Sequence, residues 1–216
     1  MTTLTSSVTT SIDFSLPASP EAVIRAVDAL HTRGIKVQIV DNAAQALAKV
    51  HDLIPAGATI MTGMSQTLQE IGLEAELINK QHPWINLKDE ILAETDPALQ
   101  MQLRVKSVLS PWYLGSVHAI AETGEIVVGS GTGSQLPAYA YSSPNVLWVA
   151  GTQKIVPTLD AALRRVREYS LELEHQRMRA FGYPGALLAK LLIIEHEPEK
   201  MGRNVQLILV NRAIGA

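Results

Sequence analysis

One stretch of the chain, Ala119 to Ser134, brings a carboxylate, a turn and a glycine-rich loop close together. An apolar run ends in Glu122, a Thr-Gly turn follows, and a second β-branched run leads into the loop. A carboxylate at the end of an apolar strand beside such a loop can act as a nucleophile or general base. The pattern therefore predicts that Glu122 is a catalytic residue.

The loop at the end of this stretch alternates glycine with serine and threonine. Glycines allow positive φ and remove the Cβ atoms that keep a ligand away from backbone amides. The spacing lacks both G-x-G-x-x-G and G-K-[ST], so it indicates neither dinucleotide nor P-loop ATP binding. We expect a small anionic ligand here, and a plain hairpin connection is the alternative. The substrate-binding residues expected in this segment are Thr123, Gly124, Gly129, Ser130, Gly131, Thr132 and Gly133.

His118 lies four residues before Glu122. On a strand this spacing places both side chains on one face, so His118 is also assigned to substrate binding. We expect the two residues at the rim of a cleft, with the amides of Gly131 and Gly133 nearby. The other histidines are scattered and form neither H-x-H nor H-E-x-x-H, so no metal site and no cofactor are expected.

A second glycine-bearing junction, Met61 to Thr67, separates an apolar run from a helical pattern. Unpaired N–H groups and the helix dipole make such an N-terminus suitable for a phosphate or carboxylate. Ordinary capping is the alternative, and Thr67 and Glu70 have the spacing of a capping box. The substrate-binding residues expected at this junction are Thr62, Gly63 and Ser65, and we expect the junction to face the same cleft as 129–134.

The elements that position these residues follow an α/β pattern. A helix opens at Ser19-Pro20, a strand covers 35–40, a second helix follows Asp41-Asn42, and a strand covers 58–61. Such alternation predicts a parallel sheet with helices on both faces and ligands at the strands' carboxyl ends. Further strands are expected at 146–150, 191–194 and 205–210, with a long helix after Pro157 and a loop over 135–145.

Composition limits the function classes. With 216 residues, 47% of them hydrophobic, the chain can form one α/β domain over 19–216, after a disordered Ser/Thr-rich tail over 1–18. A net charge of -3 without any basic run argues against nucleic acid. The absence of cysteine excludes disulfides and cysteine-ligated clusters within this sequence. No apolar run approaches a membrane span, so we expect no membrane association and a cytoplasmic location.

Several segments resemble the LUD domain family, which includes lactate-utilisation protein C. They are 61–73, 119–124, 154–163 and the ending 205–211. The resemblance implies a three-layer α/β/α fold with a mostly parallel sheet, related to ribose-5-phosphate isomerase and the CoA-transferases. It also implies a role in the oxidation of lactate to pyruvate beside iron–sulfur partner proteins. Lys154, which begins the third segment, joins the expected substrate-binding residues.

Residues 121–131 are also similar to the CoA-transferase pattern of Glu-Asn-Gly, a short strand and a glycine loop. Glu122 falls on the nucleophilic Glu of that pattern, and Thr123 stands where it has Asn. Two function classes stay open. One is an enzyme or ligand-binding subunit for a small carboxylate or its phosphate or CoA derivative. The other is a non-catalytic accessory subunit of an iron–sulfur lactate-oxidising complex, which predicts an exposed apolar patch and glycine-loop amides bonded internally.

The aromatic and Pro-rich segment from Gln135 to Asn145 also bears on assembly. Small α/β proteins of this kind often associate, and aromatic side chains are enriched at subunit interfaces. We therefore expect a homo-oligomer in which this segment helps to cover a neighbouring subunit's cleft.

Overall fold

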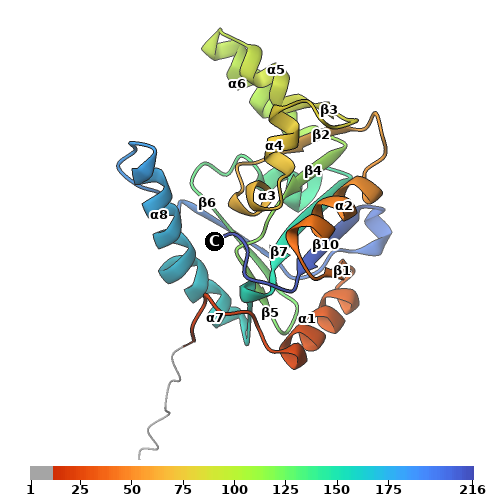
Figure 1. Ribbon diagram of the computed structural model, residues 1–216, viewed down its shortest axis with the longest axis vertical. Helices are drawn as coiled ribbons and strands as arrows, with labels where there is room; N and C mark the ends of the chain where they lie inside the picture. The colour runs from red at the N-terminus through yellow and green to blue at the C-terminus, as the bar shows by residue number, and fades with distance from the viewer. Residues whose placement is uncertain (1–11) are drawn as a thin grey trace, which may run out of the picture.

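A six-stranded parallel sheet forms the centre of the computed structural model, which describes residues 12–216 (Figure 1). Residues 1–11 of the predicted tail lie outside the described residues, and Phe14 within its range is buried. Because every pairing is parallel, the carboxyl ends of the strands meet at one edge of the sheet. In spatial order the strands are β1 (Lys36–Val40), β10 (Asn204–Val210), β7 (Asn145–Gly151), β4 (Trp112–Gly115), β2 (Thr59–Thr62) and β3 (Ile85–Asn86).

Three helices cover one face of this sheet: α2 (Ala43–Leu53), α3 (Gln66–Glu70) and α4 (Leu73–Ile78). Asn42 starts α2 by accepting a hydrogen bond from the Gln45 amide at 3.0 Å. The apolar stripes of these helices pack on alternate residues of the strands, as the pleat requires. The core on this side includes Val50, Leu68, Leu73, Ile60, Leu114, Val149 and Ile208.

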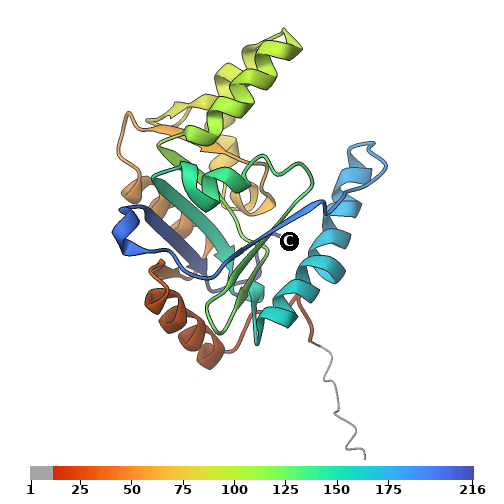
Figure 2. The ribbon, with the colours of Figure 1, turned by 180° about the vertical axis from the view of Figure 1, so that it is seen from behind.

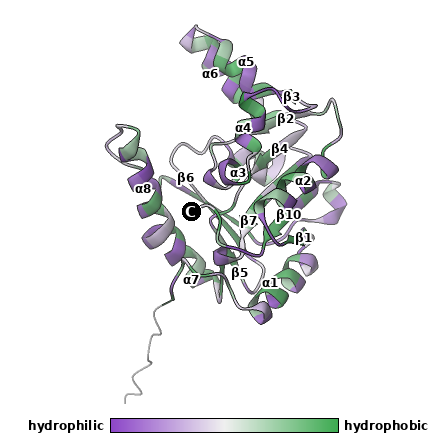
Figure 3. Ribbon diagram, viewed as in Figure 1, coloured by the Kyte–Doolittle hydropathy of each residue, from purple (hydrophilic) through white to green (hydrophobic). Residues whose placement is uncertain are grey.

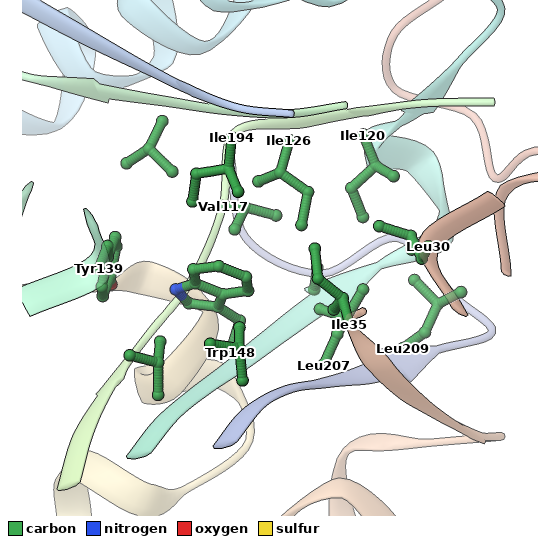
Figure 4. Close-up of a cluster of buried hydrophobic side chains, with 14 of the residues drawn as sticks. Leu30, Ile35, Val117, Ile120, Ile126, Tyr139, Trp148, Ile194, Leu207 and Leu209 are labelled. Carbon is green, nitrogen blue, oxygen red and sulfur yellow. The ribbon is translucent and has the colours of Figure 1, made fainter. Parts of the chain in front are cut away.

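A second sheet of four strands packs against the opposite face, beside α1 (Pro20–Thr32). Figure 4 shows side chains of both sheets, among them Ile126 and Trp148, meeting in the core between them. The far face of the second sheet is covered by the long helix over residues 159–180. The sequence did not predict this sheet, because an apolar strand does not reveal its partner. In spatial order its strands are β8 (Ile155–Val156), β5 (Ala119–Ala121), β6 (Ile126–Ser130) and β9 (Lys190–Ile194).

The long helix predicted after Pro157 is present but is not uniform. It consists of α7 (Leu159–Arg164), a π-helical segment (Arg165–Ser170) and α8 (Leu171–Ala180). The segment expected as a loop over 135–145 likewise contains a π-helical turn, Ala138–Ser142. Helices α5 (Leu87–Ala93) and α6 (Pro97–Lys106) form an arm that projects from the body (Figures 1 and 2). The short 3₁₀ turns are Ser107–Leu109, Thr152–Lys154 and Glu199–Met201.

The predicted α/β class, with a parallel sheet between helical layers, is confirmed. The second sheet is an addition inserted between the central sheet and the helix α7–α8. Within residues 12–216, no helix combines the length and the apolar character that crossing a bilayer requires.

Gly115, the last residue of β4, has no room for a side chain. A methyl group at this position would lie 1.7 Å from the Tyr139 hydroxyl, whose ring packs edge-on against Tyr113 and Trp148. Gly115→Ala should therefore lower the free energy of unfolding by about 1–3 kcal/mol, the usual range for overpacking. Urea denaturation measures the change. Gly63→Ala is the control, because a methyl group there meets nothing within 4 Å, and equal effects of the two substitutions would contradict the steric argument.

Candidate functional site

Three segments at the carboxyl ends of β2, β4 and β7 bring together Thr67, Ser116 and Lys154. The Lys154 ammonium donates to Thr67 Oγ1 and to Ser116 Oγ, both at 3.1 Å. The Thr67 hydroxyl also donates to Ser116 Oγ at 3.1 Å. We call these three residues the Lys154 cluster. It lies where ligands bind in open parallel sheets.

Lys154 is a buried cation that lacks a counter-ion. Only 2% of its surface is exposed, and no carboxylate forms an ion pair with it among residues 12–216. Burial, reinforced by the charge of Arg165 and opposed by Glu70, lowers the pKa of Lys154 to about 7. Because an isolated buried charge is costly, an anion that entered the cluster would be stabilised strongly.

Arg165 is a second buried cation behind the cluster. Its guanidinium donates to the backbone oxygens of Gln153, His118 and Phe14 and to Ser170 Oγ. Burial lowers the pKa of Arg165 to about 10. The two buried cations give this part of the interior a positive potential.

Arg165 was not predicted from the sequence, because an arginine in a helix is usually exposed to solvent. It lies four residues after buried Ala161, so helical spacing places it on the face of the helix that packs on the second sheet. Arg164, one residue earlier, is half exposed and pairs with Glu168.

His118 lies beside the cluster and is neutral. Its Nδ1 accepts a hydrogen bond from the Gly129 amide at 3.2 Å, which leaves the proton on Nε2. Burial, together with the charges of Lys154 and Arg165, lowers the pKa of His118 to about 3. At neutral pH the neutral imidazole can therefore donate a further hydrogen bond through Nε2.

This shift predicts a pH dependence of stability. The unfolded chain takes up a proton at His118 near pH 6.5, whereas the folded protein does so only near pH 3, so stability falls as the pH drops through this window. In His118→Asn, whose amide oxygen can still accept from Gly129, that part of the loss should disappear. Urea denaturation between pH 7 and pH 4 measures the difference from the wild-type protein. Parallel pH curves for the two proteins would rule the argument out.

Most residues of the predicted glycine loop form hydrogen bonds within the protein. Gly129 and Ser130 belong to β6 and pair with β9, so only the residues after them form a loop. Ser130 Oγ accepts from the Gly133 amide at 2.8 Å, and the Lys190 side chain packs against Gly133. Thr132 Oγ1 accepts from the Ser134 amide. Gly129, in the strand before the loop, donates to His118, which lies beside the Lys154 cluster.

The other predicted junction lies at the end of β2. Ser65 is the N-cap of α3 and accepts from the Leu68 amide at 3.3 Å. The capping box predicted for Thr67 is therefore wrong, because α3 starts earlier and the Thr67 hydroxyl bonds within the Lys154 cluster. A pocket of about 10 Å³, enough for one water, is lined by Thr62, Gly63, Ser65, Leu68, Glu74 and Leu77.

Glu122 lies away from these residues, in the turn between β5 and β6. Its carboxylate pairs with Arg25 of α1 at 2.6 Å. The hairpin register, with Ile120 opposite Ile126, puts this turn roughly 15 Å along the strands from Gly131. The expectation that Glu122 and the glycine loop share a cleft is thus wrong, because the turn and the loop lie at opposite ends of the hairpin.

The rest of this turn is also fastened to α1. Arg33 donates to the Thr123 carbonyl at 2.8 Å and pairs with Glu125 at 2.6 Å. Gly124 has φ of +95°, and a methyl group there would lie 3.0 Å from the Ala29 backbone, so both its conformation and its close approach require glycine. In this structure Thr123 and Gly124 therefore join the second sheet to α1.

A larger groove, of about 310 Å³, lies elsewhere, along β9. Its cation, Arg203, is fully engaged by Glu197 and by the carbonyls of Ala138, Tyr139, Ala140 and Ser143. This groove therefore offers an anion no unpaired charge, and the Lys154 cluster is the better candidate. Within the described part of the chain, no group of three or more His, Asp or Glu side chains is arranged to hold a metal ion.

A C-terminal strap, residues 211–215, crosses the Lys154 cluster. Gln153 Nε2 donates to the carbonyls of Ile214 and Gly215 at 2.7 and 3.1 Å. The Gly215 amide donates to Glu70 at 2.8 Å. A methyl group at Gly215 would lie 2.0 Å from Thr67 Oγ1. The strap thus packs directly on the cluster and helps to bury it.

Comparison with known proteins agrees with this architecture. The family model described as the LUD domain matches residues 23–182. The chain is similar to the crystal structure of a DUF162 family protein from Deinococcus radiodurans, with 15% identity, a TM-score of 0.53, and coverage of 90% of this chain and 99% of that one. A likeness to eIF2B beta from Chaetomium thermophilum has a TM-score of 0.34 and 15% identity, over 65% of this chain and 46% of that one. No curated protein matches the chain.

Proposed function

Because the chain belongs to the LUD domain family, we propose that it takes part in lactate utilisation as a subunit that binds a small carboxylate at the Lys154 cluster. The link to lactate comes from the family resemblance. The observation that supports carboxylate binding is the buried Lys154 ammonium, which has two hydroxyl partners and no ion-pair partner in the described chain. A buried cation of this kind favours an anionic ligand.

The cluster also suits the chemistry of lactate and pyruvate. Each carries a carboxylate beside a second oxygen, a hydroxyl in lactate and a carbonyl in pyruvate. Lys154 would bind the carboxylate, while the hydroxyls of Thr67 and Ser116 can donate to the neighbouring oxygen. His118, held neutral, adds a hydrogen-bonding group without adding charge. The confined site favours a small carboxylate over a bulky phosphate or CoA derivative.

Isothermal titration calorimetry with lactate, pyruvate, acetate, inorganic phosphate and CoA tests the proposal. Lactate or pyruvate should bind with the highest affinity, and acetate, which lacks the second oxygen, should bind more weakly. Lys200→Met, at an exposed lysine, is a control that should bind like the wild-type protein. The proposal fails when none of the carboxylates binds at millimolar concentration.

A non-catalytic accessory role beside an iron–sulfur lactate-oxidising protein is the second candidate function. Two observations favour it: the glycine-loop amides of Gly129 and Gly133 are bonded internally, and Glu122 is paired with Arg25. Binding of a carboxylate without turnover would be consistent with both candidate functions, since the protein would then sense or position the substrate of a partner protein.

The substitution Glu122→Gln separates a catalytic from a structural role for this carboxylate. It removes one ion pair with Arg25, whose side chain is 58% exposed, so stability should fall by less than about 1 kcal/mol. Carboxylate affinity should stay within roughly twofold of wild type, because the turn lies far from Lys154. Calorimetry and urea denaturation provide the two readouts. A tenfold loss of affinity or of any turnover would instead support Glu122 as the catalytic residue.

A further inference from the structure

The arm formed by α5 and α6 presents a helix that the body does not cover. It projects from one end of the molecule in both ribbon views (Figures 1 and 2). None of the residues of α6 is buried. The helix is held by partly buried Leu103 and by Gln100, which donates to the carbonyls of Ile91 and Glu94. The face of α6 opposite these contacts is open to solvent.

That open face is apolar. Ala98, Met101 and Val105 lie three and four residues apart on α6, and Leu109 follows at the end of the adjoining 3₁₀ turn. The last three have 60%, 64% and 65% of their surface exposed. We call these four residues the α6 stripe. Figure 3 shows hydrophobic and hydrophilic residues side by side along the arm. A contiguous apolar stripe on an exposed, projecting helix is typical of a protein–protein contact.

The charges at the ends of α6 indicate what covers the stripe. Glu94 and Asp96 lie at its start, and Arg104 and Lys106 lie near its end. Across residues 12–216, none of these four side chains forms an ion pair. A second α6 packed antiparallel would place the basic end of each helix level with the acidic end of the other.

We propose that the α6 stripe is the interface of a homodimer in which the two α6 helices pack antiparallel about a twofold axis near Met101. Such an interface is isologous, so one stripe with opposite charges at its two ends is self-complementary. The projection of the arm lets the two stripes meet while the bodies stay apart (Figure 1). The proposal does not depend on the ligand or on lactate.

Light scattering and sedimentation velocity at micromolar concentrations test the assembly. The wild-type protein should be a dimer, and the double substitution Met101→Glu/Val105→Glu should weaken the dimer at least roughly tenfold, since it puts charges into the apolar centre. Both positions are exposed, so the circular dichroism spectrum should not change. The control Arg179→Glu, on exposed α8, should stay dimeric. A monomeric wild-type protein, or a dimer that survives the double substitution, would overturn the proposal.

The chain contains no cysteine, which allows a direct test of the axis. Met101→Cys introduces a single thiol next to its own copy across the twofold axis, so mild oxidation should convert the protein to a covalent dimer rapidly. Arg179→Cys is the matched control on α8 and should cross-link at least roughly tenfold more slowly, because collision alone brings its thiols together. Equal rates for the two variants would show that α6 does not pair with itself.

Discussion

Replacing Lys154 by methionine is expected to abolish carboxylate binding and to make the ligand-free protein more stable. Methionine keeps the length of the side chain, and the hydroxyls of Thr67 and Ser116 still bond to each other. The buried charge, which is unfavourable in the empty protein, is removed. At or below neutral pH the gain in unfolding free energy should be on the order of 3 kcal/mol, and affinity should fall at least roughly a hundredfold.

The charge of Lys154 should make both stability and carboxylate binding depend on pH. The pKa of Lys154 is about 7 in the folded protein and 10.5 in the unfolded chain. Between these values the unfolded chain holds more protons, so wild-type stability rises with pH across that window, and the rise should be missing from Lys154→Met. Carboxylate affinity should fall in the same direction, as the free ammonium loses its proton above about pH 7.

Urea denaturation at pH 6, 8 and 10, combined with calorimetry at pH 6 and 8, measures both effects. Lys154→Met should gain stability most at pH 6, and carboxylate binding by the wild-type protein should be stronger at pH 6 than at pH 8. A variant that binds carboxylate as well as the wild-type protein does would remove the anion site from this cluster. A variant that is less stable at pH 6 would show that the ammonium is already compensated inside the fold.

Replacing Arg165 by leucine is expected to destabilise the protein by about 3–5 kcal/mol, the range for breaking a buried charged network. Leucine fills part of the space but donates no hydrogen bond. The carbonyls of Gln153 and His118 and the hydroxyl of Ser170 would then lose a donor inside the core. These residues anchor the segments that carry Lys154 and His118, so carboxylate binding should weaken as well.

The neighbouring residue offers a close control. Arg164 has a half-exposed side chain and makes a surface ion pair with Glu168, so Arg164→Leu should cost less than about 1 kcal/mol. Chemical denaturation of both variants at one pH makes the comparison. Similar stability losses for the two variants would mean that the Arg165 side chain is not buried in the core in solution.

Much of the fold was predictable because local sequence patterns indicate it. The Ser19-Pro20 start of α1, the alternation of strands and helices and the apolar run of β10 all indicated a parallel α/β sheet. The sequence could not assign β9 and β10 to different sheets, because both are short apolar runs and pairing partners are set by long-range packing.

The candidate site was predictable in part for the same reason. The rule that parallel strands place their carboxyl ends at one edge indicated the junction after β2, and the family resemblance added Lys154. The sequence pattern around Glu122 and the glycines was misleading. Glu122 lies in the turn between β5 and β6, and the glycine loop follows the other end of β6, so residues close in sequence lie apart in the structure. Arg165 was not predicted because arginine is normally a surface residue, and nothing in the sequence shows that this one is buried.

The strap over the Lys154 cluster has a consequence for the speed of ligand capture. Gln153 and Glu70 hold residues 214 and 215 against Thr67, so a carboxylate has to wait until these bonds open before it can reach the ammonium. In a stopped-flow experiment the observed association rate would then level off as ligand concentration rises, at the opening rate of the strap. Glu70→Gln weakens the bond to the Gly215 amide and should raise that plateau. At low ligand concentration, the observed association rate would depend on diffusion and on the fraction of molecules in which the strap is open.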